Sequence, residues 1–382
     1  MTTKGEAGVS AAAAERVAAM RGLALAALVA LGALGLARAA PAPGEAASLL
    51  GSLDAGLRAA AIGVFLFASG WATAPFWNAV FQSEGTARGA LRVAHRVWQI
   101  YWRYIGAVAA SAAILTVIAG PEDRAAAHAA FGLGGLAEAP RETMLGLALL
   151  IEQPAAFAPL QAYALIVLAA PLMIVIGARA PAAALGISAA LYLVAQGLAM
   201  QGVALQGFDA PRGWPLDPVA WQLAFCVGFA FGAGWIRPEV ERPRAVWLIA
   251  AAGAAVSVAS IALSGLTADP AGPGAVAAAR PWLLVVAAAI GLAAYGGLRD
   301  APAALSRLLA RIGRQSLAAL AALGPILALL QGLFGPAPSP GAAALSALCG
   351  LCLLYAAAAI SAWFMDPPWA KPAPRSEKPR AA

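Results

Sequence analysis

Charged residues are scarce in this chain of 382 residues, since they make up only 11% of it. Soluble globular domains carry about a quarter. Hydrophobic residues reach 62%, and the mean hydropathy is +0.78. A soluble fold cannot bury that much apolar surface, so the composition excludes a soluble domain and predicts a polytopic membrane protein.

Cysteine and histidine are also rare, with three and two copies. Cys226, Cys349 and Cys352 all fall in apolar runs, where thiols stay protonated and inert. The redox-like spacing of Cys349 and Cys352 is therefore interpreted as helix packing. His95 and His128 are expected on opposite sides of the membrane, so no metal site is predicted.

Long apolar runs are what the chain has in abundance. Each is close to the roughly 20 residues that cross a bilayer as a helix. We predict an all-α polytopic membrane protein with about ten transmembrane helices, near residues 17–37, 58–79, 102–119, 160–178, 181–199, 219–236, 246–264, 281–297, 316–333 and 342–363. The run Met144–Ile151 is too short to cross, and we expect it to lie at the interface or to dip in and out.

The basic residues indicate the orientation of these spans. With both termini cytoplasmic, all but six of the 25 lysines and arginines fall in inner segments, as the positive-inside rule requires. The six outer ones are Arg38, Arg58, Arg124, Arg141, Arg212 and Arg280. This bias accounts for the net charge of +7 without a nucleic-acid partner.

The two ends of the chain are predicted separately. Ala37-Arg38-Ala39 resembles a signal-peptide cleavage site, but the long basic region before the first run favours a retained span. Residues 367–382 are rich in proline and basic residues, so we predict a disordered cytoplasmic tail on the anionic inner leaflet. Residues 1–366 are predicted to form a single transmembrane domain.

A basic and aromatic segment spans Arg92 to Tyr104. Arg92, Arg96 and Arg103 recur at helical spacing and form one cationic stripe. The stripe fits two roles equally well. It could be an interfacial anchor, or a site for phosphate or carboxylate groups of a cytoplasmic donor. His95, in the same segment, is expected to be solvated, with a role as a base left open.

The run from Trp214 to Trp235 opens with an expected helix cap, Asp217-Pro218. Trp214 and Trp221 fit an interfacial belt. Gln222 requires a partner or a polar cavity, because an amide in a membrane is costly. Gly228, Gly232 and Gly234 predict a close contact with another helix.

Polar residues in two earlier segments are interpreted as structural. Arg16 and Arg21 open the first span, where positive-inside anchors are expected. Ser69-Gly70 lies in the middle of the second, where small residues favour close helix packing.

These segments together resemble the OpgC family, membrane acyltransferases related to the wider acyltransferase-3 superfamily. Its F-x-F-x-S-G element matches Phe65–Gly70, and its N-P-x-x-W-Q-L-x-F-x-x-G element matches Asp217–Gly228 with Asp217 in place of Asn. Further elements match Arg96–Tyr104, Leu160–Pro171 with Tyr163, and Leu309–Leu317 with Arg314 and Ser316. The elements occur in the same order over most of the chain.

The resemblance implies transfer of an acyl group, succinyl in the type member, to a periplasmic glucan or another hydroxyl acceptor. It implies a bacterial inner-membrane location, no bound cofactor, and an acyl-CoA as the cytoplasmic co-substrate. The candidate substrate- or donor-binding residues are Arg16, Arg21, Ser69, Arg92, Arg96, Arg103, Tyr163, Asp217, Trp221, Gln222, Arg314 and Ser316.

The first span departs from the family pattern. The family's Asp falls at Ala18, and its Asp-His pair falls at Leu31-Gly32. Acyl transfer to a hydroxyl needs a general base, most often His. Two hypotheses therefore stand: a diverged acyltransferase that uses another base, or a catalytically inactive relative that acts as a transporter, scaffold or partner subunit.

Overall fold

The structure is a computed structural model that describes residues 11–37, 45–154, 156–200, 216–236, 290–335 and 339–365. Within these ranges it holds helices and no strand. The helices are α1 (Ala11–Ala37), α2 (Glu45–Glu84), α3 (Thr86–Ile118), α4 (Arg124–Ala130), α5 (Gly135–Glu138), α6 (Pro140–Ala148), α7 (Ala158–Arg179), α8 (Pro181–Met200), α9 (Pro218–Gly232), α13 (Ala303–Arg314), α14 (Ser316–Phe334) and α15 (Pro340–Met365). Residues 290–297 are helical as well.

Seven of these helices are long and apolar enough to cross a membrane: α1, α2, α3, α7, α8, α14 and α15. They coincide with seven of the predicted runs, which confirms a multi-pass helical membrane protein. The run 219–236 coincides with α9, whose 15 residues reach only about 22 Å. The run 246–264, most of 281–297, Trp214 and the tail 367–382 lie outside the described residues. The total of ten spans and the cytoplasmic termini therefore stay predictions.

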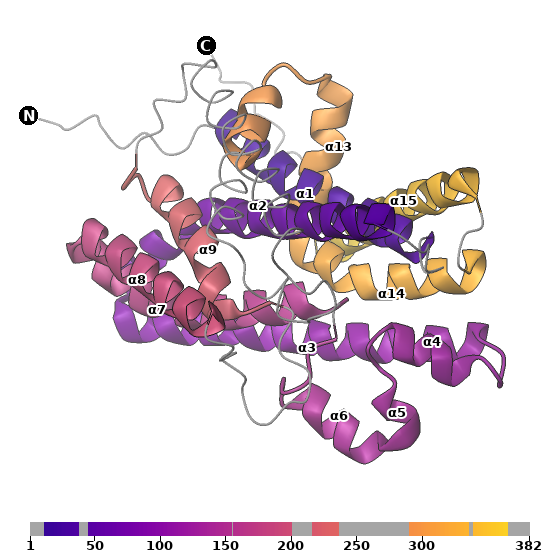
Figure 1. Cartoon of the computed structure of the whole chain (residues 1–382). Helices are drawn as coiled ribbons and strands as arrows, with labels where there is room; N and C mark the ends of the chain where they lie inside the picture. The colour runs from indigo at the N-terminus through magenta and orange to yellow at the C-terminus, as the bar shows by residue number, and fades with distance from the viewer. Residues whose placement is uncertain are drawn as a thin grey trace, which may run out of the picture.

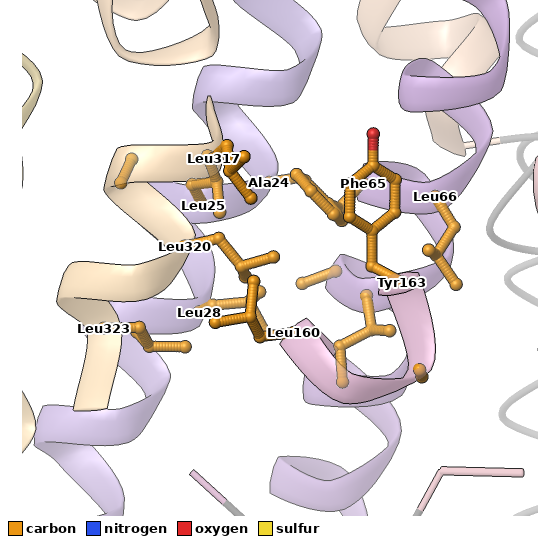
Figure 2. Close-up of a cluster of buried hydrophobic side chains, with 14 of the residues drawn as sticks. Ala24, Leu25, Leu28, Phe65, Leu66, Leu160, Tyr163, Leu317, Leu320 and Leu323 are labelled. Atoms are coloured by element: carbon orange, nitrogen blue, oxygen red, sulfur yellow. The ribbon is translucent and has the colours of Figure 1, made fainter. Parts of the chain in front are cut away.

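Helices α1 and α2 pack against each other and organise the bundle (Figure 1). On one side α1 contacts α13, α14 and α15, while on the other α2 contacts α9 and α7. Helix α3 reaches both groups, because it packs against α7 and α14. Figure 2 shows leucines of α1 and α14 meeting Phe65 of α2 and Tyr163 of α7 in one buried apolar cluster. Phe65, Tyr163 and Leu317 each belong to a segment that resembles the OpgC family, so this cluster brings three of those segments together.

Glycines set a close contact between α2 and α9. A Cβ on Gly228 would overlap the carbonyl oxygen of Phe67, and one on Gly232 would overlap that of Trp71. The close contact predicted from these two glycines is therefore confirmed. The prediction is wrong for Gly234, which lies in the turn that follows α9, with a φ of +72° and open space beside it. Its left-handed backbone explains why glycine occurs there.

The short run near Met144–Ile151 does not cross the bundle. The end of helix α6 meets α3, where the Tyr101 hydroxyl donates a hydrogen bond to the carbonyl oxygen of Ala148 at 3.0 Å. Tyr101 lies near the middle of α3, so this bond ties the end of the segment to that helix.

Candidate functional site

A cavity of about 740 Å³ lies between α2, α3 and α7. One wall is polar and comes from α3, with Arg92, His95, Arg96 and Gln99. Residues three and four apart share one face of a helix, which is why these four side chains reach the same space. The remaining lining is largely apolar and aromatic, formed by Ala72, Thr73, Phe76, Trp77, Leu91, Tyr163 and Val167.

The cationic stripe predicted on α3 is divided in the structure. Arg92 forms a two-point ion pair with Glu84, Nε to Oε2 at 2.7 Å and Nη2 to Oε1 at 2.7 Å. Arg96 lines the cavity and bonds to a neutral side chain, Gln99. Arg103 interacts electrostatically with Arg96 but does not line the cavity. Arg92 and Arg96 therefore line this cavity, while Arg103, the third residue of the predicted stripe, lies outside its lining.

Gln99 joins two of the cavity residues. Arg96 Nη1 donates a hydrogen bond to Gln99 Oε1 at 3.1 Å, and Gln99 Nε2 lies 3.0 Å from His95 Nε2. Neither Gln99 nor His95 was among the predicted site residues. Their spacing of four residues on an expected helix was the available signal.

Tyr163 connects the cavity with the buried cluster. Its ring packs edge-on against Phe65, with centroids 5.6 Å apart, and against Phe225 at 6.4 Å. Figure 2 shows its hydroxyl directed toward the end of the cluster where Leu317 lies. The ring is buried and also lines the cavity, so Tyr163 sits at the inner limit of that space.

Arg21 is a cation enclosed by the bundle. Its Nη2 donates a hydrogen bond to the hydroxyl of Ser316, while its Nε is buried without a hydrogen-bond partner. Tyr163 and Arg96 both act on it electrostatically. The structure thus joins Arg21 of α1 to Ser316 of α14, within electrostatic range of Tyr163 and Arg96. Arg21 and Ser316 do not line the cavity itself.

Arg16 has a structural contact instead. Its guanidinium lies 4.4 Å from the centroid of the Tyr295 ring. Tyr295 stacks on Trp71 at 4.8 Å, and Trp71 stacks on Phe231 at 5.2 Å. Arg16 therefore ends an aromatic column through a cation–π contact and does not reach the cavity.

The α9 element, from Asp217 to Gly228, is also structural where it is described. Asp217 caps the helix by accepting a hydrogen bond from the Val219 N–H at 2.8 Å, as predicted. Trp221 is only 2% exposed, so it packs in the core and is not a belt residue. Gln222 accepts from the Ser188 hydroxyl at 2.6 Å and donates to the Ser188 carbonyl at 2.8 Å. Its partner is thus helix α8, and none of these residues lines the cavity.

Two remaining candidates are placed away from the cavity as well. Ser69 is fully buried on α2 with no hydrogen-bond partner for its hydroxyl, beside the contact of Gly70 with α9. Arg314 is exposed in the last turn of α13.

The three positions of α1 that depart from the family pattern are occupied by packing contacts. The Ala18 carbonyl meets Gly313 of α13, and the Leu31 carbonyl accepts a hydrogen bond from Arg58 at 2.8 Å. A Cβ on Gly32 would lie 2.6 Å from Leu327 Cδ2, so Leu327 of α14 fills the space a side chain would need there. Nearby, Arg58 pairs with Asp54 at 2.9 Å, an ion pair the sequence reading did not single out.

No three His, Cys, Asp or Glu side chains in the described part of the chain gather to hold a metal ion. The sequence model of the family described as OpgC protein matches residues 15–366, nearly the whole length. No curated protein and no solved structure matches the chain.

Proposed function

Because the chain belongs to the OpgC family, we propose that it is an integral membrane acyltransferase of the bacterial inner membrane. It takes an acyl group from a cytoplasmic acyl-CoA held in the cavity between α2, α3 and α7. It passes this group, a succinyl group by analogy with the family, to a periplasmic glucan or another hydroxyl acceptor.

The composition of the cavity carries this proposal. An acyl-CoA combines phosphates with a long, largely neutral arm, and the cavity combines a basic wall with an apolar remainder. Arginine is well suited to phosphate because its planar fork donates two parallel hydrogen bonds. Arg96 has a neutral partner in Gln99, so its charge is not cancelled by that contact.

The inner limit of the cavity offers groups that would stabilise the charge that develops during acyl transfer. In this reaction the acceptor oxygen bonds to the thioester carbon, the carbon–sulfur bond breaks, and the hydroxyl proton ends on the leaving thiolate. Negative charge develops on the carbonyl oxygen, and fixed donors stabilise it. Tyr163 supplies a hydroxyl at this place, and the buried guanidinium of Arg21 adds positive potential.

A second candidate function is a catalytically inactive relative that binds the donor as a scaffold or partner subunit. The observation that favours it is the packing of α1. Ala18, Leu31 and Gly32 supply no acid or base, and Leu327 occupies the space beside Gly32.

The deciding experiment uses the full chain in lipid nanodiscs with radiolabelled acyl-CoA and periplasmic glucans. We expect labelled glucan to accumulate. Binding of the donor without label transfer, for several acyl groups, would instead establish the inactive relative.

The variant Arg96→Ala tests the cavity in the same samples. We expect it to lower donor affinity about tenfold, since a charge-assisted hydrogen bond to phosphate is lost. Arg88→Ala removes an exposed arginine of the same helix outside the cavity and is the matched control. Equal donor affinity in both variants would contradict a donor site at Arg96.

A further inference from the structure

The cavity wall contributed by α3 holds a continuous chain of hydrogen bonds. It runs from the Arg96 guanidinium through the Gln99 amide to the His95 imidazole, at 3.1 and 3.0 Å. All three side chains line the cavity, so the chain faces the space where a ligand would lie.

The direction of this chain follows from the chemistry of its first member. An arginine guanidinium only donates, so the Gln99 atom that faces Arg96 is its oxygen. The amide nitrogen, which also only donates, then faces His95 Nε2. For this contact to be a hydrogen bond, that nitrogen accepts, which requires a neutral imidazole with its proton on Nδ1. Gln99 thus fixes one tautomer of His95 and leaves Nδ1–H as its remaining donor.

We infer that Gln99 is a positioning residue that holds Arg96 and His95 as a two-donor site for a phosphate group. The inference rests on the proposed function in assigning that phosphate to the acyl donor. A doubly protonated His95 would set two donors against each other at Gln99, so the site works with a neutral imidazole beside one permanent cation.

The other charged groups at the cavity do not take the place of Arg96 and His95 in binding phosphate. Arg92 already bonds both oxygens of Glu84, and it contributes to a ligand only by leaving that ion pair. The cavity lining contains no Asp or Glu among the described residues. An anion in the cavity therefore meets the donors of Arg96 and His95 without an adjacent unpaired carboxylate.

The phosphate has two possible sources. A soluble donor such as an acyl-CoA carries several, and a phospholipid carries one with hydrocarbon tails. Phe76 and Leu91 line the cavity and are 56% and 71% exposed, so the apolar side of the cavity is accessible to lipid. The test must separate the two.

The first arm measures CoA binding by calorimetry on the full chain in phosphatidylcholine nanodiscs. Gln99→Leu is expected to weaken binding about three- to tenfold, the effect of losing an organising hydrogen bond. Gln82→Leu is the matched control, because Gln82 is exposed on α2 outside the cavity. Nanodiscs that contain phosphatidic acid then show whether a lipid phosphate competes with CoA.

The second arm reads the tautomer by NMR of ¹⁵N-labelled histidine. His128→Gln leaves His95 as the one histidine of the chain, since the sequence has two. We expect the Nδ1–H tautomer with Gln99 in place and a shift toward Nε2–H in Gln99→Leu. A purely structural role for Gln99 would not change this signal.

Unchanged CoA affinity together with an unchanged tautomer in Gln99→Leu would overturn the inference. Absence of CoA binding by the wild type would instead remove the donor from the proposed function. In that case Gln99-dependent binding of phosphatidic acid would still support the phosphate site, and binding of neither ligand would refute it.

Discussion

At the scale of single residues, some partly buried polar side chains of this bundle have partners on neighbouring helices. Gln222 bonds twice to Ser188, and Arg58 bonds to the carbonyl of Leu31. Such bonds between membrane helices contribute about 0.6 kcal/mol on average and up to about 1.7 kcal/mol. Gln222 is thus a link between α8 and α9, which removes the need to assign it to a substrate.

Asp217 gives a prediction at this scale. Burial raises the pKa of this carboxyl, an effect larger than the lowering by the N–H groups of Val219 and Ala220. The folded state therefore binds the proton more tightly than the unfolded chain. The contribution of Asp217 to stability is present below the ordinary carboxyl pKa of about 3.9 and is lost as pH rises through the raised folded value.

Asp217→Asn keeps an oxygen acceptor at the cap and removes the charge. We expect it to be at least as stable as the wild type at pH 7, with a flatter dependence of Tm on pH above about 4. Asp217→Ala loses the cap and is expected to be about 1 kcal/mol less stable. A lower Tm for Asp217→Asn than for the wild type at pH 7 would show that the charge stabilises α9.

At the scale of elements, glycines determine how closely helices approach. Gly228 and Gly232 bring α9 against the backbone of α2, and Gly22 and Gly313 do the same for α1 and α13. Helix α9 thereby places Phe225 against Tyr163, and α13 leads into α14, where Ser316 bonds to Arg21. The two close contacts position the residues at the inner limit of the cavity.

Gly228→Ala tests this arrangement. Its methyl group would meet the carbonyl oxygen of Phe67, which is backbone and cannot move alone. We expect the free energy of unfolding to fall by about 1–3 kcal/mol, the usual effect of overpacking. Gly186→Ala on α8 is the control, since nothing lies near its Cβ, and alanine there favours the helix. Equal unfolding free energies for the two variants would exclude a close α2–α9 contact.

At the scale of the whole molecule, the proposed donor site depends on how the bundle is oriented in the membrane. The turn at Gly85 joins α2 to α3 and lies next to Glu84, which pairs with Arg92 at the cavity. Since acyl-CoA is cytoplasmic, this turn must face the cytoplasm for the proposed function to hold. The positive-inside rule predicts that orientation.

Alkaline phosphatase fusions measure it directly. We expect an inactive fusion after Gly85 and an active one after Gly120, which follows α3 at its other end. A fusion after Ala382 is expected to be inactive, in agreement with a cytoplasmic tail. Activity at Gly85 would place the cavity on the periplasmic side and contradict a cytoplasmic donor.

The sequence by itself determined the class of the protein, the seven described spans and the family. Run length and hydropathy suffice for spans, because only a helix of about 20 apolar residues satisfies its backbone across a bilayer. Local signals also held at Asp217, whose cap depends on residues two positions away, and at Gly228 and Gly232.

Only the tertiary structure decided which side chains share a site. Arg92, Arg96 and Arg103 share one face of α3, yet α2 and α7 enclose the cavity beside the first two only, and the third lies about two turns further along the helix. Ser188 became the partner of Gln222, and Leu327 filled the space at Gly32, through contacts between helices far apart in the chain. Such contacts depend on how helices pack together, which the periodicity of any one helix does not specify.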